Sequence, residues 1–386
     1  MEAPDERAAA GGRRRWFRAL AVSPWLLLGA MLVWIAVDIV RLNRIEHAEI
    51  RERLERYYAR KQGIEIPYPK AYRWLSPTHR NIFLFGASSV VLSDGATFHY
   101  FLEQRLIREV NPELRLLNFG YCGVDSFTIE RTVRELLERQ DKPAPDLLVF
   151  YMGHNEYANA YHHVISKAYD AFEPLLAVPW LLSDVEDFEP YLRLQTPRIL
   201  KALQEGSLVD IEGRDYGCYD ALILEQFARK LDAILELARA RDIPVVMLSP
   251  VGNLRAEPFG ALERVSRVWE QGLAEPDYGE SIRLLEQARD AEILTFDVRA
   301  KSPLIAHLRA LAADGRIVLL DLDQDWKRER LAFGPEQFMD YFHLREPVHR
   351  RIADQIFELL TSHPRLRPRI LPRAAAAETP LVPAPR

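Results

Sequence analysis

Residues 81–91 read "NIFLFGASSVV", and this stretch predicts how the fold is built. A run of strand-like apolar residues leads into Gly86, Ala87 and the two hydroxyls of Ser88 and Ser89. Short continuous apolar runs are typical of strands that are buried on both faces of a parallel sheet. Glycine and serine are also common turn residues, so the pair of hydroxyls alone is compatible with an ordinary turn. The interpretation therefore depends on what the chain places near the same strand end.

Further segments of the same kind follow along the chain. Apolar runs bounded by helix- and strand-breaking residues predict strands at 81–85, 114–119, 146–151, 244–249 and 317–322. Apolar stripes at helical spacing predict helices at 97–110, 127–139 and 221–240. This alternation of strands and helices predicts an α/β fold with a doubly wound parallel sheet and right-handed crossovers. We expect the domain to span residues 66–362.

Two long segments interrupt the alternation, at about 157–217 and 252–315. The first is aromatic and contains proline, and the second has a helical pattern. Both follow the carboxyl ends of predicted strands, where α/β proteins bind their ligands. We expect them to be insertions that form a lid and specificity elements. From 363 to 386 the content of proline, alanine and arginine predicts a disordered tail.

The N-terminal region predicts a membrane anchor. An arginine-rich stretch at 13–18 precedes a long apolar run, so we expect a transmembrane helix at 19–40 followed by a charged helical stalk at 41–65. The arginines place residues 1–18 in the cytoplasm and the main domain on the extracytoplasmic, periplasmic side. An uncleaved single-pass anchor is favoured over a signal peptide, because Ala36-Val37-Asp38 is a poor cleavage site.

Composition excludes several classes of function. The chain has 386 residues and a formal net charge of -5, without the basic excess that nucleic acid binding requires. Its two cysteines, Cys122 and Cys218, are too few for a disulfide framework and lack metal-ligand spacing. A single disulfide between them stays open for an exported domain.

Polar residues follow three of the predicted strands, and an acid and a histidine lie near the end of the domain. Since the carboxyl ends of parallel strands share one edge of a sheet, these residues are expected to lie together. Asp340 and His343 are three residues apart, a spacing that puts both side chains on one face of a helix-like turn. The other positions are Gly86-Ala87-Ser88, Gly120 and Gly153-His154-Asn155-Glu156.

The chemistry that uses these residue types is acyl transfer. A serine hydroxyl becomes a nucleophile when a histidine takes its proton, and a carboxylate fixes the histidine tautomer. The tetrahedral intermediate needs hydrogen-bond donors at its oxyanion, each of which contributes about 3–4 kcal/mol. Candidate donors are the N–H groups of Ser88 and Gly120 and the side-chain amide of Asn155.

The order of these motifs resembles the SGNH (GDSL-like) hydrolases. The resemblance covers about residues 81–360 and implies a three-layer αβα fold with a flavodoxin-like sheet. It implies Ser88 as nucleophile, His343 as base and Asp340 as the acid that orients it. Gly120 and Asn155 would complete the oxyanion hole with Ser88, and neither metal nor cofactor is implied. The "GHNE" form of the third motif is similar to a bacterial membrane-tethered subgroup.

One position departs from the pattern of this family. Ala87 stands where the family has aspartate between the glycine and the serine, which makes Ser89 a competing nucleophile. Non-catalytic roles for the motif residues also stay open. Ser88 would then be a turn residue, Asn155 a loop cap, and Asp340 with His343 a surface pair at the start of a helix.

The resemblance and the predicted anchor together lead us to expect a membrane-anchored extracytoplasmic serine esterase. The expected substrate is an ester on a cell-envelope molecule such as an O-acetylated glycan, with a lipid ester as another option. Two alternatives stay open. One is an O-acyltransferase that uses the same triad, and the other is a non-catalytic binding or scaffold protein on a decayed hydrolase fold.

Overall fold

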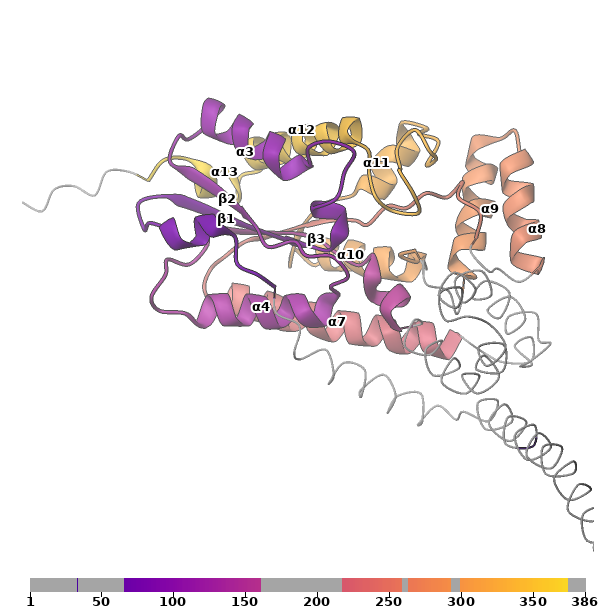
Figure 1. Cartoon of the computed structure of the whole chain (residues 1–386), viewed down its shortest axis with the longest axis horizontal. Coiled ribbons are helices and arrows are strands. Elements are labelled where there is room, and N and C mark those ends of the chain that lie inside the picture. The colour runs from indigo at the N-terminus through magenta and orange to yellow at the C-terminus, as the bar shows by residue number, and fades with distance from the viewer. Residues whose placement is uncertain (1–32, 34–65, 161–216, 259–262, 293–298, 374–386) are drawn as a thin grey trace, which may run out of the picture. The chain divides into compact units, whose positions relative to one another are not determined.

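The computed structural model describes Val33 and residues 66–160, 217–258, 263–292 and 299–373 (Figure 1). The chain divides into two units, one of Met1–Glu49 with Ile165–Arg214 and one of Ile50–Val164 with Asp215–Arg386. Apart from Val33, every described residue belongs to the second unit. The predicted anchor at 19–40, the stalk and most of the first insertion therefore lie outside the described residues. Within the described ranges, no helix combines the length and apolar character needed to span a membrane.

The second unit is built on a parallel sheet of five strands in the order β2-β1-β3-β4-β5. Each predicted strand is confirmed to within two residues at either end, because each is an apolar run between breakers. The strands are β1 (Arg80–Gly86), β2 (Leu114–Asn118), β3 (Leu147–Tyr151), β4 (Val245–Leu248) and β5 (Val318–Leu320).

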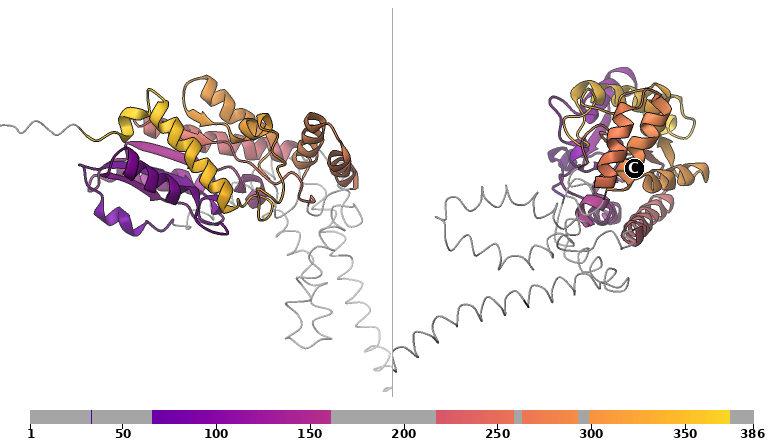
Figure 2. Two further views of the ribbon diagram at one scale, coloured as in Figure 1. Left: turned by 90° about the horizontal axis from the view of Figure 1, so that it is seen from above. Right: turned by 90° about the vertical axis from the view of Figure 1, so that its right-hand side faces the viewer.

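Helices cover both faces of the sheet and give three layers (Figures 1 and 2). One face carries α3 (Phe98–Glu109) and α12 (Glu346–Ser362), which pack against each other. The other face carries α4 (Ser126–Glu138) and α7 (Gly217–Arg239), which also pack together. The three predicted helices that fall in this unit, α3, α4 and α7, are confirmed. This is the doubly wound α/β architecture that the alternation predicted.

The strand order fixes where a ligand site is expected. β1 pairs with β2 on one side and with β3 on the other. The connection from β1 to β2 and the connection from β2 to β3 therefore pass over opposite faces of the sheet. A crevice is expected outside the carboxyl ends of β1 and β3, where the two connections diverge. Ser88 follows β1 and Asn155 follows β3, so the predicted motifs flank this point.

An aromatic ladder runs from the end of the edge strand β2 across β1 to β3. Phe85 stacks on Phe119 and on Phe150, with ring centroids 5.2 Å apart in each pair. All three rings are fully buried. Aromatic pairs of this kind add about 0.5–1.5 kcal/mol each beyond their buried area, so the ladder fixes the register just below the carboxyl edge.

The second predicted insertion is shorter than expected. Its clearest helical stretch forms a hairpin of α8 (Glu263–Ala274) and α9 (Tyr278–Asp290), which pack against each other. The last part of 252–315, however, is α10 (Ser302–Ala313), a helix that packs against β5 and α7. α10 is therefore the ordinary crossover from β4 to β5, and the helical pattern alone did not separate it from the hairpin.

The predicted disordered tail is wrong for residues 363–373. They follow α12 and contain the short helix α13 (Arg367–Ile370), with Leu366 and Ile370 fully buried. Arg373 closes this segment onto the sheet through a 2.9 Å ion pair with Asp146. The prediction weighed composition and overlooked the two apolar anchors between the prolines. Residues 374–386 lie outside the described ranges.

A buried histidine predicts an acid-sensitive fold. His349 on α12 is fully buried and stacks on Phe98. Burial lowers the pKa of His349 to about 4, against the opposing effect of the Leu92 backbone and Asp94. In the unfolded chain a histidine titrates near 6.5, so its contribution to stability is complete above about pH 6.5 and declines toward pH 4. The decline is at most about 1.4 kcal/mol per pH unit.

Replacing His349 by phenylalanine is expected to flatten this part of the stability profile. The measurement is the free energy of unfolding in urea for both proteins at pH 7 and pH 4.5. Equal losses of stability in wild type and His349→Phe between these pH values would contradict the assignment.

Candidate active site

The predicted nucleophile lies in a tight turn at the end of β1. The strand ends at Gly86, and a short 3-10 helix, η3, spans Ser88–Val90. Ser88 keeps 6% of its surface exposed, whereas Ser89 is completely buried. The Ser89 hydroxyl has no hydrogen-bond partner among the described residues. Of the two serines, only Ser88 is accessible to solvent, so the structure favours Ser88 as the reactive residue.

Gly86 is required by the close approach of the neighbouring chain. A Cβ atom at this position would lie 2.6 Å from the Tyr151 carbonyl oxygen and 2.6 Å from Cγ1 of Val90. We expect Gly86→Ala to lower the free energy of unfolding by about 1–3 kcal/mol, as overpacking does. Gly279→Ala on α9 is the matched control, because its Cβ would meet nothing closer than 3.4 Å. Urea denaturation checks both, and equal stabilities of the two variants would contradict the steric argument.

Asp340 and His343 form the predicted pair. His343 Nδ1 lies 2.5 Å from Asp340 Oδ2, and the N–H groups of Phe342 and His343 donate to Oδ1 at 3.0 and 2.8 Å. Burial raises the pKa of the Asp340 carboxyl, but the hydrogen bonds from His343 and Phe342 outweigh this effect and lower the pKa overall. The carboxylate holds the proton of the imidazole on Nδ1, which leaves Nε2 as the basic nitrogen.

The second ring nitrogen of His343 is available for a proton. Nε2 is buried and has no hydrogen-bond partner among the described residues. The loop after Ser88 reaches the same region, because Asp94 accepts a 2.7 Å hydrogen bond from the N–H of Glu346, three residues beyond His343. Across the described part of the chain, no hydrogen bond joins Ser88 to His343 directly. The structure therefore brings the two turns to one edge of the sheet without closing a contact between them.

Two of the three predicted oxyanion donors are free to bind a ligand. Asn155 uses one hydrogen of its amide to donate to the Val124 carbonyl at 2.9 Å, which leaves the second hydrogen. The N–H of Ser88 makes no hydrogen bond within the described ranges. Both residues are 6% exposed. Each of these groups is a donor of the kind that stabilises a tetrahedral oxyanion.

The third predicted donor is occupied. The N–H of Gly120 donates to the side-chain oxygen of Asn118 at 2.8 Å. The Asn118 amide is itself held by the Val90 carbonyl at 3.0 Å. The prediction of a free Gly120 donor is thus corrected: Asn118 folds back over the end of β2 and accepts this hydrogen bond. The glycine itself is explained, because a Cβ there would lie 2.1 Å from Cγ2 of Val90.

A histidine with no predicted role lies beside the pair. His154 is 1% exposed and packs edge-on against Tyr151, with centroids 4.6 Å apart. It also contacts Phe342, the neighbour of His343. Burial, together with the charge of His343, lowers the pKa of His154 to about 3, while the Val251 backbone acts in the opposite direction. His154 is therefore neutral at working pH. In the sequence, the position of His154 directly after Gly153, at the end of a buried strand, indicates a place near the site.

The last residue of the third motif, Glu156, has a structural role. Glu156 accepts hydrogen bonds from the N–H and the hydroxyl of Ser126, both at 2.8 Å. This ties the start of α4 to the segment that carries Asn155. Cys122, two residues after Gly120, is a free cysteine and is exposed.

Other candidate sites receive no support within the described ranges. No group of three histidine, cysteine or acidic side chains there is arranged to hold a metal ion. Two surface hollows lie away from the predicted site: one is lined by Arg80, Pro244 and Gly315, the other by Tyr68 and Tyr72 with several basic side chains. Neither includes Ser88, Asn155 or His343. The adjacent histidines His162 and His163, a residue type that binds metals, lie outside the described residues.

Comparison with known proteins finds distant likenesses in structure. No protein-family model and no curated protein sequence matches the chain. The acetyl xylan esterase AlAXEase is 14% identical with a TM-score of 0.38, covering 72% of this chain and 99% of that one. A lipolytic protein of the G-D-S-L family from Veillonella parvula is 13% identical with a TM-score of 0.38, covering 73% and 99%. The lipase/acylhydrolase from Enterococcus faecalis is 12% identical with a TM-score of 0.33, covering 77% and 100%. At these identities and TM-scores the likeness is distant.

Proposed function

We propose that this chain is a serine hydrolase of the SGNH type that cleaves ester bonds. Ser88 is the nucleophile, His343 the general base and Asp340 the acid that orients it. The observation that carries the proposal is the Asp340–His343 pair, whose unpartnered Nε2 lies at the same sheet edge as the turn that carries Ser88.

The reaction follows from these positions. Nε2 of His343 takes the hydroxyl proton as Ser88 Oγ attacks the ester carbonyl carbon. The oxyanion that forms accepts hydrogen bonds from the Ser88 N–H and the free hydrogen of the Asn155 amide. His343 then gives its proton to the departing alcohol oxygen, which leaves an acyl group on Ser88. Water, activated by His343 in the same way, releases the acid and restores the serine.

The substrate class follows from the expected location. The arginine cluster and the apolar run at 19–40 support an N-terminal anchor with the domain on the extracytoplasmic side of the membrane. We propose an ester on a cell-envelope glycan or lipid as the substrate. An O-acyltransferase would use the same acyl-enzyme but pass the acyl group to a hydroxyl in place of water.

Ester turnover by the full chain in detergent tests the proposal. Nitrophenyl esters from acetate to octanoate, each with and without an oligosaccharide acceptor, separate the outcomes. Hydrolysis that is independent of the acceptor supports the esterase, and acyl transfer that appears only with the acceptor supports the acyltransferase. A folded protein that consumes no ester under either condition and forms no adduct with a fluorophosphonate would overturn the proposal in favour of a binding protein.

A further inference from the structure

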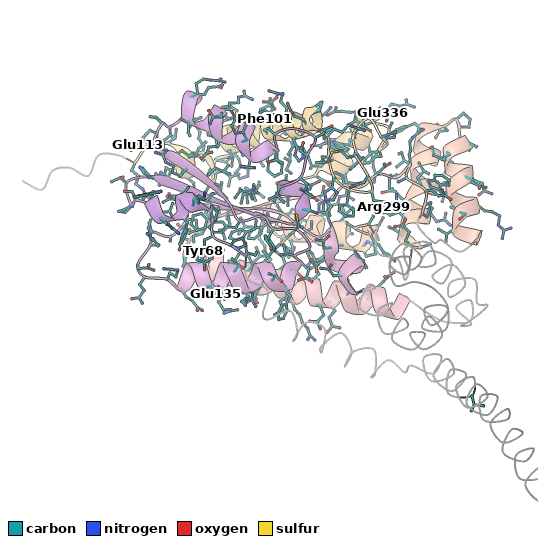
Figure 3. All side chains as sticks on the ribbon, in the orientation of Figure 1. Tyr68, Phe101, Glu113, Glu135, Arg299 and Glu336 are labelled. Carbon is teal, nitrogen blue, oxygen red and sulfur yellow. The ribbon has the colours of Figure 1, made fainter. Side chains whose placement is uncertain are left out.

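Arg299 and Glu292 form an ion pair inside the protein. Both side chains are 1% exposed, and the guanidinium donates from Nη2 to Oε1 and from Nε to Oε2 of the carboxylate. Figure 3 labels Arg299 between the sheet and the α8–α9 hairpin. Burying two charges costs several kcal/mol per ion, which is offset only when the geometry is good and the remaining donors are satisfied. The partners of the remaining N–H donors of Arg299 therefore show what else the buried pair holds in place.

Arg299 uses another donor to hold the loop after β4. Its Nη1 donates to the backbone carbonyl of Asn253. Gly252 leaves room for this approach, because a Cβ there would lie 3.3 Å from Cδ of Arg299 and 3.4 Å from the Tyr341 carbonyl oxygen. The guanidinium also lies over the Tyr341 ring, 5.9 Å from its centroid. Arg299 thus joins the hairpin side of the unit to the loop that carries Asn253.

Asn253 in turn holds the turn of the predicted catalytic pair. Its amide donates to the Asp340 carbonyl at 3.0 Å, and its N–H donates to the Tyr341 carbonyl at 2.8 Å. Its side-chain oxygen accepts from the N–H groups of Arg255 and Ala256, so the amide orientation is fixed. Asn253 is 7% exposed. Two consecutive carbonyls of the Asp340–His343 turn are therefore anchored from outside the turn.

We propose that Asn253 is a positioning residue for the Asp340–His343 pair and that the buried Glu292–Arg299 pair fixes Asn253. The catalytic consequence rests on the proposed function. The Asp340 carboxylate accepts from His343 only while its peptide keeps this orientation, and a misplacement of about 1 Å is able to cost 100-fold in rate. The segment that follows the α8–α9 hairpin is in this way coupled to the general base.

Arg299→Lys tests the coupling, with Arg289→Lys as its matched control. Lysine is able to pair with Glu292, but it lacks the planar fork that reaches Asn253 at the same time. Arg289 is also a buried arginine, 3% exposed, and pairs with Glu286 and Asp290 on α9. None of its described contacts reaches Asn253 or the catalytic turn. The two variants should lose similar stability in urea.

Two readouts separate positioning from stability. The first is the downfield proton resonance of the His343–Asp340 hydrogen bond, observed by NMR on the full chain in detergent. We expect Arg299→Lys and Asn253→Asp to move it upfield and broaden it, and Arg289→Lys to leave it unchanged. The second is ester turnover, where we expect about a 10-fold or greater loss in kcat with little change in KM.

The outcomes distinguish this inference from the proposed function. An unchanged resonance in Arg299→Lys, or an equal change in Arg289→Lys, would overturn the positioning role. If wild type turns over no ester but its resonance responds to Arg299→Lys and not to Arg289→Lys, the hydrolase proposal fails and the positioning role stands.

Discussion

Replacing Ser88 by alanine is expected to abolish ester turnover and the covalent adduct with a fluorophosphonate. Removal of the nucleophile from a serine triad typically lowers kcat by about 10⁶-fold. The fold should survive, because Ser88 is a turn residue and the hydrogen bonds that close the turn use its backbone carbonyl. Intact mass after probe treatment and kcat with a nitrophenyl ester measure the effect.

Ser89→Ala is the matched control for this change. Ser89 is fully buried, and its hydroxyl has no partner among the described residues, so its loss removes an unsatisfied polar group. We expect the adduct and most of the turnover to persist, with stability unchanged or slightly higher. An adduct that survives in Ser88→Ala and disappears in Ser89→Ala would move the nucleophile by one residue.

Asp340→Asn is expected to lower kcat by about 10⁴-fold while the protein stays folded. The amide oxygen still accepts from the N–H groups of Phe342 and His343, but an amide no longer stabilises a positive imidazole or fixes its tautomer. Asn155 and Ser88 keep their donors, so binding should change little and KM should stay within a few-fold. Steady-state kinetics measure the split between kcat and KM.

Asp94→Asn serves as the control for removing a carboxylate near the site. Asp94 accepts from the N–H of Glu346 and pairs with Arg345 at 3.2 Å, but it does not contact His343 in the described structure. Its turnover should stay close to wild type. Equal losses in Asp94→Asn and Asp340→Asn would show that local loop structure, not the Asp340–His343 pair, controls the rate.

Asp340→Asn is also expected to change how the free energy of unfolding depends on pH. Hydrogen bonds lower the pKa of Asp340 in the folded state. Its contribution to stability is therefore present above the ordinary carboxyl pKa of about 3.9 and is lost as the pH falls through the lowered value. Wild type should lose more stability than Asp340→Asn in this acid range.

Much of the fold was predictable because local sequence and burial agree. Each strand is a continuous apolar run between breakers, which has few alternatives to a strand buried on both faces. The same holds for the order of the motifs, since parallel strands bring their carboxyl ends to one edge. The Asp340–His343 contact was predictable for a similar reason, because a three-residue spacing acts within a single turn.

Predictions that depended on composition were weaker. The tail at 363–373 has few apolar residues, yet Leu366 and Ile370 are enough to pack it against the domain. The pattern at 252–315 is helical throughout, but only contacts with the sheet separate α10 from the hairpin. Periodicity reports that a face is apolar and does not report what covers it.

The sequence by itself determined the α/β architecture, the edge at which the motifs gather and the choice of chemistry that they permit. Only the tertiary structure decided that Ser88 is reachable and Ser89 is not, and that Asn118 takes the Gly120 donor. It alone joined Asn253 to Asp340 across 87 residues and to Arg299 across 46. The physical reason is that a motif specifies residues along the chain, whereas burial and hydrogen-bond partners are set by the segments that pack around them.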